Sequence, residues 1–264
     1  NKEKRKTKSK ESVDSNPLPK PNMKDKEAIY NYAHQFAYGE NGVPVDKKEA
    51  ATYYKIAANK GYPPAMHKYA RALEKGDGVK KNKKAAASLY KKAAKKGYAQ
   101  SMTNYGVMLQ NGEGVKEDKA KAAKYYQRAA DEGDTIAMFN FALMVENGDG
   151  VDQDLELAAA YYKRAADKGD PRAMHNYAVM LYNGDGVNVN KRESAQYHKR
   201  AAEKGDLKST YRYSQTLEDG KGIQIDKQEA AKFYKIGADK GEINCIHNYA
   251  RMLHTGNGIK KNRK

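Results

Sequence analysis

The stretch GDPRAMHNYAVMLYNGDGV, residues 169–187, decides the fold of this chain because the sequence repeats it at a fixed interval. Its first glycine recurs every 36 residues, at Gly61, Gly97, Gly133, Gly169, Gly205 and Gly241. A mostly aromatic pair keeps the same spacing, from Tyr53-Tyr54 to Phe233-Tyr234. A period of about 20–50 residues is typical of stacked supersecondary units. The sequence therefore predicts a repeat array and not a domain built around one central core.

Each repeat is predicted to be two helices joined by a glycine turn. Asp170 and Pro171 favour a helix start, because aspartate caps the first turn and proline fits it. Apolar residues then recur at three- and four-residue steps, at Met174, Tyr177, Ala178 and Leu181. Residues 183–186, Asn-Gly-Asp-Gly, end this helix because glycine adopts conformations that a helix interior resists. The second helices are predicted to begin at the caps Asp46, Asn82, Asp118, Asp154, Asn190 and Asp226, with capping-box partners at Glu49, Glu193 and Glu229.

These positions carry a family resemblance. The pattern A-M-x-N-Y-A-x-M-L-x-N-G-x-G-V, then Asp or Asn, then A-x-x-Y-Y-K-x-A-A-x-x-G-D, resembles the Sel-1-like repeat, a relative of the tetratricopeptide repeat. It covers residues 27–264, as six full repeats plus the first helix of a seventh. The resemblance implies an all-α fold, a right-handed alpha-alpha superhelix (solenoid) of 36-residue helix-turn-helix repeats. It also implies binding to other proteins, and no shared chemistry.

The two ends of the chain differ from the array. Residues 1–26 are rich in Lys, Ser and Pro and nearly free of large apolar side chains, so they are predicted to form a basic disordered tail or linker. The chain begins with Asn1, and it ends two residues after Asn262, where the cap of a seventh second helix is expected. We expect the natural protein to continue, with an upstream signal peptide or fused domain left open.

Composition bounds the location of the protein. No apolar run approaches the roughly 18 residues of a membrane span. The single Cys245 stands in a slot that small residues fill in the other repeats, so it is predicted to be a packing residue. One cysteine and the lack of an Asn-x-Ser/Thr sequon favour a reducing, cytoplasmic location. The endoplasmic reticulum stays open if a signal peptide precedes this segment.

The sequence predicts neither a catalytic site nor a cofactor or metal site. His67, His175 and His247 share one helix position but lie two or three repeats apart, far beyond metal bonds of roughly 2 Å. The Gly-x-Gly motif lies between helices and never follows a strand, as a phosphate-binding loop does. We therefore expect a chain without enzymatic activity.

The formal net charge of +17 is unevenly spread. A run without acidic residues carries Lys80, Lys81, Lys83, Lys84, Lys91, Lys92, Lys95 and Lys96. Such a patch attracts acidic proteins, anionic membrane surfaces or nucleic acid by general electrostatics. A solvated outer face is the favoured interpretation, and nucleic acid is the weakest partner, because readers of nucleic acid usually interleave aromatics or arginines with the charge.

The candidate partner-binding site is a stripe on the first helices, opposite their apolar face and on the concave side of the solenoid. Its residues are Asn104, Val107, Asn140, Leu143, Asn176, Val179, Tyr211 and Arg212. Aliphatic side chains there would contact a peptide, and amides would hydrogen-bond its backbone. The alternative is packing, in which Val107, Leu143 and Val179 meet the next repeat while Asn111, Asn147 and Asn183 help to end the helices. The sequence leaves both open.

We interpret the chain as a non-enzymatic scaffold or adaptor for protein–protein interaction. An extended partner segment with an apolar middle and acidic ends would match the stripe, which is flanked by Lys68 and Arg71 on one side and by Arg212 and Gln215 on the other. Two alternatives stay open. One is an adaptor of an endoplasmic-reticulum-associated degradation ubiquitin ligase complex, which only the resemblance implies. The other is a regulatory or substrate-recruiting region of a larger enzyme such as a protein kinase.

Overall fold

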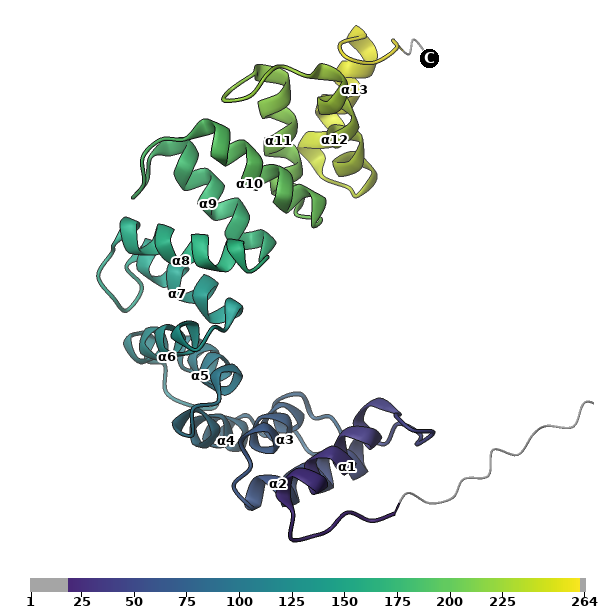
Figure 1. The fold of residues 1–264 in the computed structure, drawn as a ribbon, viewed down its shortest axis with the longest axis vertical. Helices are drawn as coiled ribbons and strands as arrows, with labels where there is room; N and C mark the ends of the chain where they lie inside the picture. Colours follow the sequence, from purple (N-terminus) through teal and green to yellow (C-terminus); the bar gives the residue numbers. More distant parts are fainter. Residues whose placement is uncertain (1–18, 262–264) are drawn as a thin grey trace, which may run out of the picture. The chain divides into compact units, whose positions relative to one another are not determined.

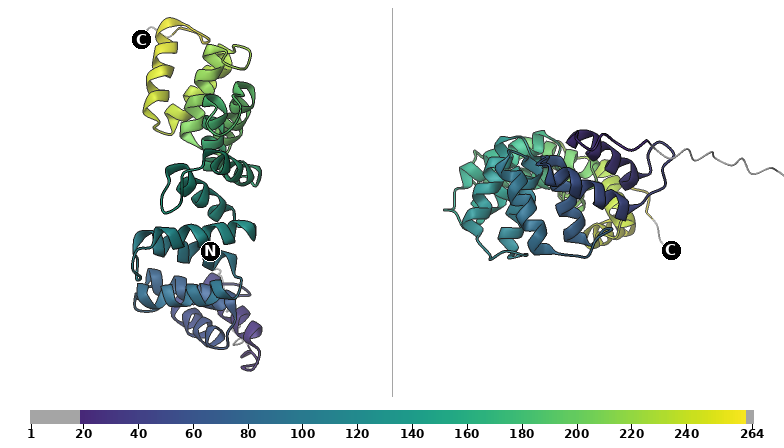
Figure 2. Two further views of the ribbon diagram at one scale, coloured as in Figure 1. Left: turned by 90° about the vertical axis from the view of Figure 1, so that its left-hand side faces the viewer. Right: turned by 90° about the horizontal axis from the view of Figure 1, so that it is seen from below.

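The computed structural model describes residues 19–261, and over this range the chain forms thirteen α-helices and no strand (Figures 1 and 2). The helices are α1 (Lys26–Tyr38), α2 (Lys47–Asn59), α3 (Pro63–Lys75), α4 (Lys83–Lys95), α5 (Ala99–Asn111), α6 (Lys119–Asp131), α7 (Thr135–Asn147), α8 (Leu155–Asp167), α9 (Pro171–Asn183), α10 (Lys191–Glu203), α11 (Leu207–Asp219), α12 (Lys227–Asp239) and α13 (Ile243–Thr255). The predicted all-α repeat fold is confirmed. Most of the expected tail, residues 1–18, and the expected cap Asn262 lie outside the described residues.

The chain divides into two compact units, unit 1 (residues 1–93) and unit 2 (residues 94–264). Odd-numbered helices are the first helices of the repeats and even-numbered helices the second, so repeat 1 is α1–α2 and repeat 6 is α11–α12. Within unit 2 each helix from α5 to α13 packs mainly against the helices next to it in sequence. Packing between sequence neighbours defines a solenoid, whose core is a row of small interfaces.

The predicted caps begin the helices. Asp170 accepts backbone hydrogen bonds from Arg172 and Ala173, and Pro171 occupies the first turn of α9. Each predicted second-helix cap also accepts a backbone N–H bond through its side-chain oxygen. The three predicted capping boxes differ from the expected form, because the backbone N–H groups of Asp46, Asn190 and Asp226 donate to carbonyls of the first helix and not to the glutamates. At Asn190 the Glu193 carboxylate accepts from the side-chain amide instead, at 2.9 Å. The helix start is unaffected.

The two glycines of the turn have different roles. Gly184 ends α9 with φ 88°, the left-handed conformation that favours glycine. Gly186 also has a positive φ, and a Cβ there would overlap the backbone of Leu155 at the start of α8. The turn of one repeat thus rests directly on the second helix of the repeat before it. This close approach explains why the motif needs glycine at both positions.

Alanine and aromatic residues form the interfaces. The first ring of each aromatic pair packs edge-on against an aromatic of the first helix, with centroids 4.9 Å apart for Tyr105 and Tyr125 and 4.7 Å apart for Phe141 and Tyr161. The second ring, at Tyr126 and Tyr162, is fully buried. The predicted inner face of α9 is confirmed, since Met174, Tyr177, Ala178 and Leu181 are all buried. Tyrosine suits this place because its ring packs while its hydroxyl finds a polar partner.

Cys245 packs as the sequence predicts. It is fully buried and forms no disulfide. Burial raises the pKa of its thiol to about 12, with a further contribution from Glu242, so the reactive thiolate is disfavoured. The facing residue is Gly237, at a position that alanine occupies in the other repeats, and a Cβ on Gly237 would overlap the Cys245 Sγ atom. The larger side chain at 245 is therefore accommodated by a smaller one at 237.

Between residues 19 and 261, none of the helices has the length and apolar character that crossing a membrane would require.

Candidate functional site: the stripe and clefts of the first helices

The eight stripe residues lie on four first helices of unit 2, two each on α5, α7, α9 and α11. None of them is buried. Leu143 has 37% of its surface exposed, and Arg212 is also exposed. Val107 and Val179 are half-buried, as are the three asparagines and Tyr211. The stripe is thus a partly covered surface, distinct from the core face on the same helices.

The stripe asparagines also contact the repeat before them. The amides of Asn140 and Asn176 lie close enough to the hydroxyls of Tyr126 and Tyr162 to affect the pKa of each. Burial raises the pKa of both tyrosines, and the two amides act in the opposite direction. An amide has two N–H donors and one acceptor oxygen, so a contact with one hydroxyl leaves it able to hydrogen-bond a ligand as well.

A row of tyrosine hydroxyl bonds runs beneath the stripe. In repeats 2, 3, 4 and 6 the second tyrosine of the second helix donates to the second-last residue of the first helix in its own repeat. These bonds are Tyr90 to Glu74 at 2.8 Å, Tyr126 to Gln110 at 2.9 Å, Tyr162 to Glu146 at 2.6 Å and Tyr234 to Glu218 at 3.2 Å. The row ties the two helices of a repeat together.

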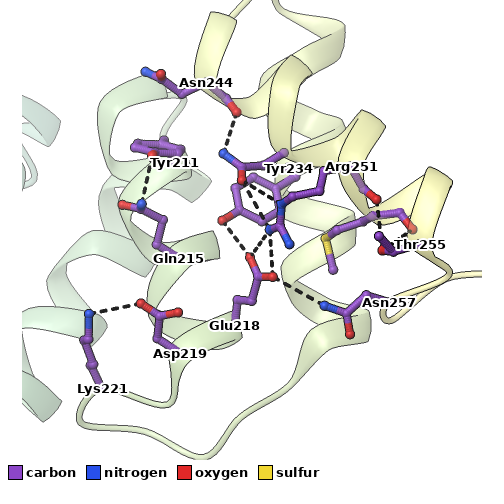
Figure 3. A network of polar contacts seen from close by, with 12 residues as sticks. Tyr211, Gln215, Glu218, Asp219, Lys221, Tyr234, Asn244, Arg251, Thr255 and Asn257 are labelled. Atoms are coloured by element: carbon purple, nitrogen blue, oxygen red, sulfur yellow. Dashed lines mark hydrogen bonds and ion pairs between the residues drawn. The ribbon is translucent and has the colours of Figure 1, made fainter.

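In repeat 6 an arginine also contacts the glutamate that is hydrogen-bonded to Tyr234 (Figure 3). Arg251, on α13, places one guanidinium nitrogen 2.7 Å from each carboxylate oxygen of Glu218. The Asn257 amide lies 3.4 Å from the same carboxylate. Glu218 therefore sits between a buried tyrosine hydroxyl, an arginine and an amide, which is a strong carboxylate site because a charged donor roughly doubles the strength of a hydrogen bond.

Repeat 5 breaks the row and opens a cleft. His198 stands where other repeats have the buried tyrosine, and Tyr182 stands where repeats 2, 3, 4 and 6 have glutamate or glutamine. An imidazole is shorter than a phenol, so it leaves space that the tyrosine would fill. A cavity of about 330 Å³ lies there between α9 and α11, with His198 and Tyr182 in its wall. The stripe residues Val179 and Arg212 also line it, as does Gln215.

The cleft is weakly cationic. Lys221 and Asp219 line it and pair with each other at 3.1 Å. Arg212 lies 3.4 Å from the Gln215 amide oxygen and has no carboxylate partner among the described residues. The Gln215 amide in turn donates to the Tyr211 hydroxyl at 2.8 Å. Arg212 thus contacts a neutral side chain, and its positive charge can pair with an anionic group of a ligand.

A buried polar cluster that sequence reasoning missed lies beside this cleft. The Ser209 hydroxyl is 2.9 Å from Nδ1 of His175 and 3.3 Å from Nδ1 of His198. Burial lowers the pKa of both histidines, that of His198 to about 3, so both rings are neutral at pH 7. A hydroxyl can donate to one neutral ring and accept from the other. The cluster satisfies the buried His198 and Ser209 and the half-buried His175 at the point where the tyrosine row is interrupted.

The cluster does not have the geometry of a catalytic triad. Asp206 lies 3.6 Å from Nδ1 of His175, the same ring nitrogen that faces Ser209. A triad needs the nucleophile and the carboxylate on opposite ring nitrogens. Ser209 is also fully buried, and Asp206 accepts its backbone N–H as a helix cap. Within residues 19–261 no group of three His, Cys, Asp or Glu residues has a metal-binding arrangement.

The predicted basic residues are mostly at the surface. Lys83 is half-buried, and the other seven are exposed, namely Lys80, Lys81, Lys84, Lys91, Lys92, Lys95 and Lys96. The first six of the eight lie in unit 1, and Lys95 and Lys96 lie in unit 2. Their exposure is compatible with the solvated face that the sequence favours.

The comparisons with known proteins match the repeat geometry. The Sel1 repeat profile matches residues 26–62, 63–98, 99–134, 135–170, 171–206, 207–242 and 243–264. The chain belongs to the Sel1 repeat family. Proteins built from Sel1 repeats are generally non-enzymatic helical scaffolds that bind other proteins. A search of the curated proteins returned no match.

Solved structures of Sel1 repeat proteins are similar to the chain. One is c5321, a protective antigen of uropathogenic Escherichia coli with an SLR fold, at 28% identity and a TM-score of 0.85; the match covers 90% of this chain and 51% of that one. The chain thus spans about half the length of this antigen. Another is a Sel1 repeat protein from Oxalobacter formigenes, at 26% identity and a TM-score of 0.76, covering 89% of this chain and 92% of that one. An immunity protein from Pseudomonas aeruginosa, PA5088, matches at 21% identity and a TM-score of 0.51 over 92% of this chain and 90% of that one, which shows the fold alone.

Proposed function

We propose that this Sel1 repeat chain is a non-enzymatic interaction scaffold that binds an extended segment of a partner protein along the stripe of unit 2. The observation that carries this proposal is the cleft between α9 and α11. Two stripe residues, Val179 and Arg212, line it, and it lies where the array lacks the tyrosine that fills the corresponding place in other repeats. A position that the chain leaves unfilled, beside a half-buried aliphatic side chain and an exposed basic one, suits an inserted partner side chain.

The chemistry of the stripe changes along its length. Val107, Leu143 and Val179 offer aliphatic contact in repeats 3 to 5. At repeat 6 the equivalent positions become polar, with Arg212 facing the cleft. The segment that fits is therefore apolar over α5 to α9 and acidic where it reaches α11. One repeat offers too little surface for a specific complex, whereas several adjoining repeats approach the roughly 800 Å² per partner of a standard interface.

A display selection of extended peptides on the full chain, followed by hydrogen exchange with the best binder, tests the proposal. We expect selected sequences with aliphatic residues followed by Asp or Glu, and slowed amide exchange on α5, α7, α9 and α11. Slowed exchange confined to the second helices α6, α8 and α10 would show that the partner binds another face. Neither a degradation adaptor nor a kinase region has an observation of its own among the described residues, so the proposal stays at the level of a scaffold.

A further inference from the structure

Repeat 1 lacks one member of the tyrosine row. The second-last residue of its first helix, α1, is Ala37, whereas the same place holds Glu74, Gln110, Glu146 and Glu218 in repeats 2, 3, 4 and 6. The helix α1 ends at Tyr38 with Gly39 as its cap, and Asn41 is the extra residue in the turn that follows. This insertion aligns Ala37, and not Tyr38, with the glutamates.

The loss of this side chain leaves a hydroxyl without a partner. Tyr54, the tyrosine of repeat 1, is only 4% exposed, and its buried hydroxyl has no hydrogen-bond partner among the described residues. Leaving a buried hydroxyl unpaired is unfavourable, and native proteins rarely do so without a reason. A cavity of about 210 Å³ lies at this place, lined by Ala37, Tyr54 and Arg71 among others.

The equivalent position beside Tyr234 contains a glutamate carboxylate. Tyr234 and Arg251 follow Tyr54 and Arg71 by five periods of 36 residues. In repeat 6 these two residues hold the carboxylate of Glu218, with the arginine 2.7 Å from both oxygens (Figure 3). Tyr54 of repeat 1 and Arg71 of repeat 2 are thus the tyrosine and the arginine of a carboxylate site, whereas Ala37 replaces the glutamate.

The charged side chains that line the cavity favour an anion. Lys47, Lys68, Arg71 and Asp77 line it, which gives three positive charges against one negative. Asp77 is already paired with Lys47 at 3.0 Å, and Lys68 donates to the Tyr38 hydroxyl at 2.9 Å. Arg71 is exposed and has no carboxylate partner among the described residues. Its guanidinium is therefore available for a two-pronged contact, the geometry that arginine forms with carboxylates.

We propose that this cavity of unit 1 binds the carboxylate of an Asp or Glu side chain of a partner protein. The Tyr54 hydroxyl donates to one carboxylate oxygen, and Arg71 takes the position that Arg251 has on Glu218. Lys68 adds positive charge at the rim. The choice of a protein side chain over a small acid rests on the proposed scaffold function, whereas the preference for a carboxylate rests on the cavity alone. Only residues of unit 1 are involved, so the stripe of unit 2 is not needed for it.

A titration of the ¹⁵N-labelled full chain with two blocked peptides tests the binding. The probes are Ac-Ala-Glu-Ala-NH₂ and its isosteric control Ac-Ala-Gln-Ala-NH₂, followed through the Arg71 Nε–H signal and the α3 amides. We expect saturable shifts with the glutamate peptide and at least tenfold weaker binding of the glutamine peptide. Arg71→Gln should weaken binding of the glutamate peptide at least tenfold and Tyr54→Phe at least threefold, while Arg192→Gln, at an exposed position of the second helix α10, leaves it unchanged.

Equal binding of the two peptides, or no effect of Arg71→Gln, would overturn the carboxylate site. Sodium acetate, or a peptide with a free C-terminus and no acidic side chain, serves as the probe for other carboxylate sources. If either binds as tightly as the glutamate peptide, the assignment to a protein side chain is wrong. Failure of the carboxylate site in unit 1 would not bear on the proposed partner binding along the stripe of unit 2, which is tested separately.

The substitution Ala37→Glu tests the same site without a ligand. It restores the glutamate of repeats 2, 4 and 6 beside Tyr54 and Arg71. We expect a higher Tm than in the parent chain, a smaller gain for Ala37→Gln, and loss of peptide binding because the new side chain occupies the cavity. Tyr54→Phe in the Ala37→Glu background should remove part of the gain. A Tm lowered by Ala37→Glu would show that the cavity is not arranged for a carboxylate.

Discussion

Replacement of Leu143 by aspartate separates a binding role of the stripe from a packing role. Leu143 on α7 and Leu157 on α8 are both leucines of unit 2, and each is 37% exposed. Full burial of a leucine contributes about 1.5–3 kcal/mol, so covering roughly two thirds of it contributes about 1–2 kcal/mol. Leu143→Asp and Leu157→Asp should therefore lower the free energy of unfolding by similar amounts. For a chain of this size the loss corresponds to a Tm about 2–8 °C lower.

The two variants should differ in binding. A charge in the aliphatic part of the stripe leaves an unpaired carboxylate under the bound segment, which costs about 2 kcal/mol or more and weakens binding at least roughly 30-fold. Leu157 lies on a second helix, outside the stripe, so Leu157→Asp should bind as the parent chain does. The assay is calorimetric titration with a peptide selected on the full chain, together with circular dichroism and thermal melting of each variant.

Three results would refute the reasoning. If Leu143→Asp unfolds the array while Leu157→Asp does not, Leu143 is a packing residue in spite of its exposure. If both variants fold and bind alike, the partner lies elsewhere on the chain. A parallel loss of affinity in both variants would likewise place the effect in stability and not in the stripe.

Three further predictions concern the core, the histidines and the lysines. Gly237→Ala should destabilise the chain by about 1–3 kcal/mol, because the added methyl group overlaps Cys245. In the Cys245→Ala background, which restores the Ala–Ala pairing of other repeats, the same change should be neutral or stabilising. Urea melts measure both effects, and additive changes in the free energy of unfolding would contradict this coupling. Because burial lowers the pKa of His67 to about 4 and of His198 to about 3, the unfolded chain binds protons first as the pH falls below 6.5, so stability present at pH 7 is lost by about 2 kcal/mol per histidine at pH 5. Urea melts at pH 7 and pH 5 measure this loss of stability. The loss should be smaller in a His67→Gln/His198→Gln double variant and unchanged in His247→Gln, which replaces an exposed histidine. An equal loss in the double variant and the parent chain would assign the pH dependence to other groups. Nucleic acid should bind only weakly and without sequence preference at low salt. This binding should disappear near physiological salt, and also when glutamate replaces Lys91, Lys92, Lys95 and Lys96. Selective binding of one nucleic acid at physiological salt would make the patch a specific site.

The sequence by itself determined the repeat, the helix boundaries and the side of each first helix that faces the core. These follow from interactions within a few residues. Asp170 caps its own helix, Gly184 ends it, and the spacing of Met174 and Leu181 defines one face. Such signals are repeated along the chain, so agreement between copies strengthens each of them. The stripe was predicted from the same periodicity, as the surface left over opposite the core.

Only the tertiary structure decided which residues meet across helices. His175, His198 and Ser209 lie 11 to 34 residues apart, and they form one cluster because neighbouring repeats bring their helices together. The 16-residue spacing of Tyr162 from Glu146 was present in the sequence as a signal, but its hydrogen bond depends on how the two helices of a repeat pack. At Ala37 a one-residue insertion after the helix shifts the register, and the consequence appears only at Tyr54, whose buried hydroxyl has no partner within residues 19–261. Local caps and turns specify the elements, whereas clefts and unpaired groups arise from the few side chains that depart from the repeat at an interface.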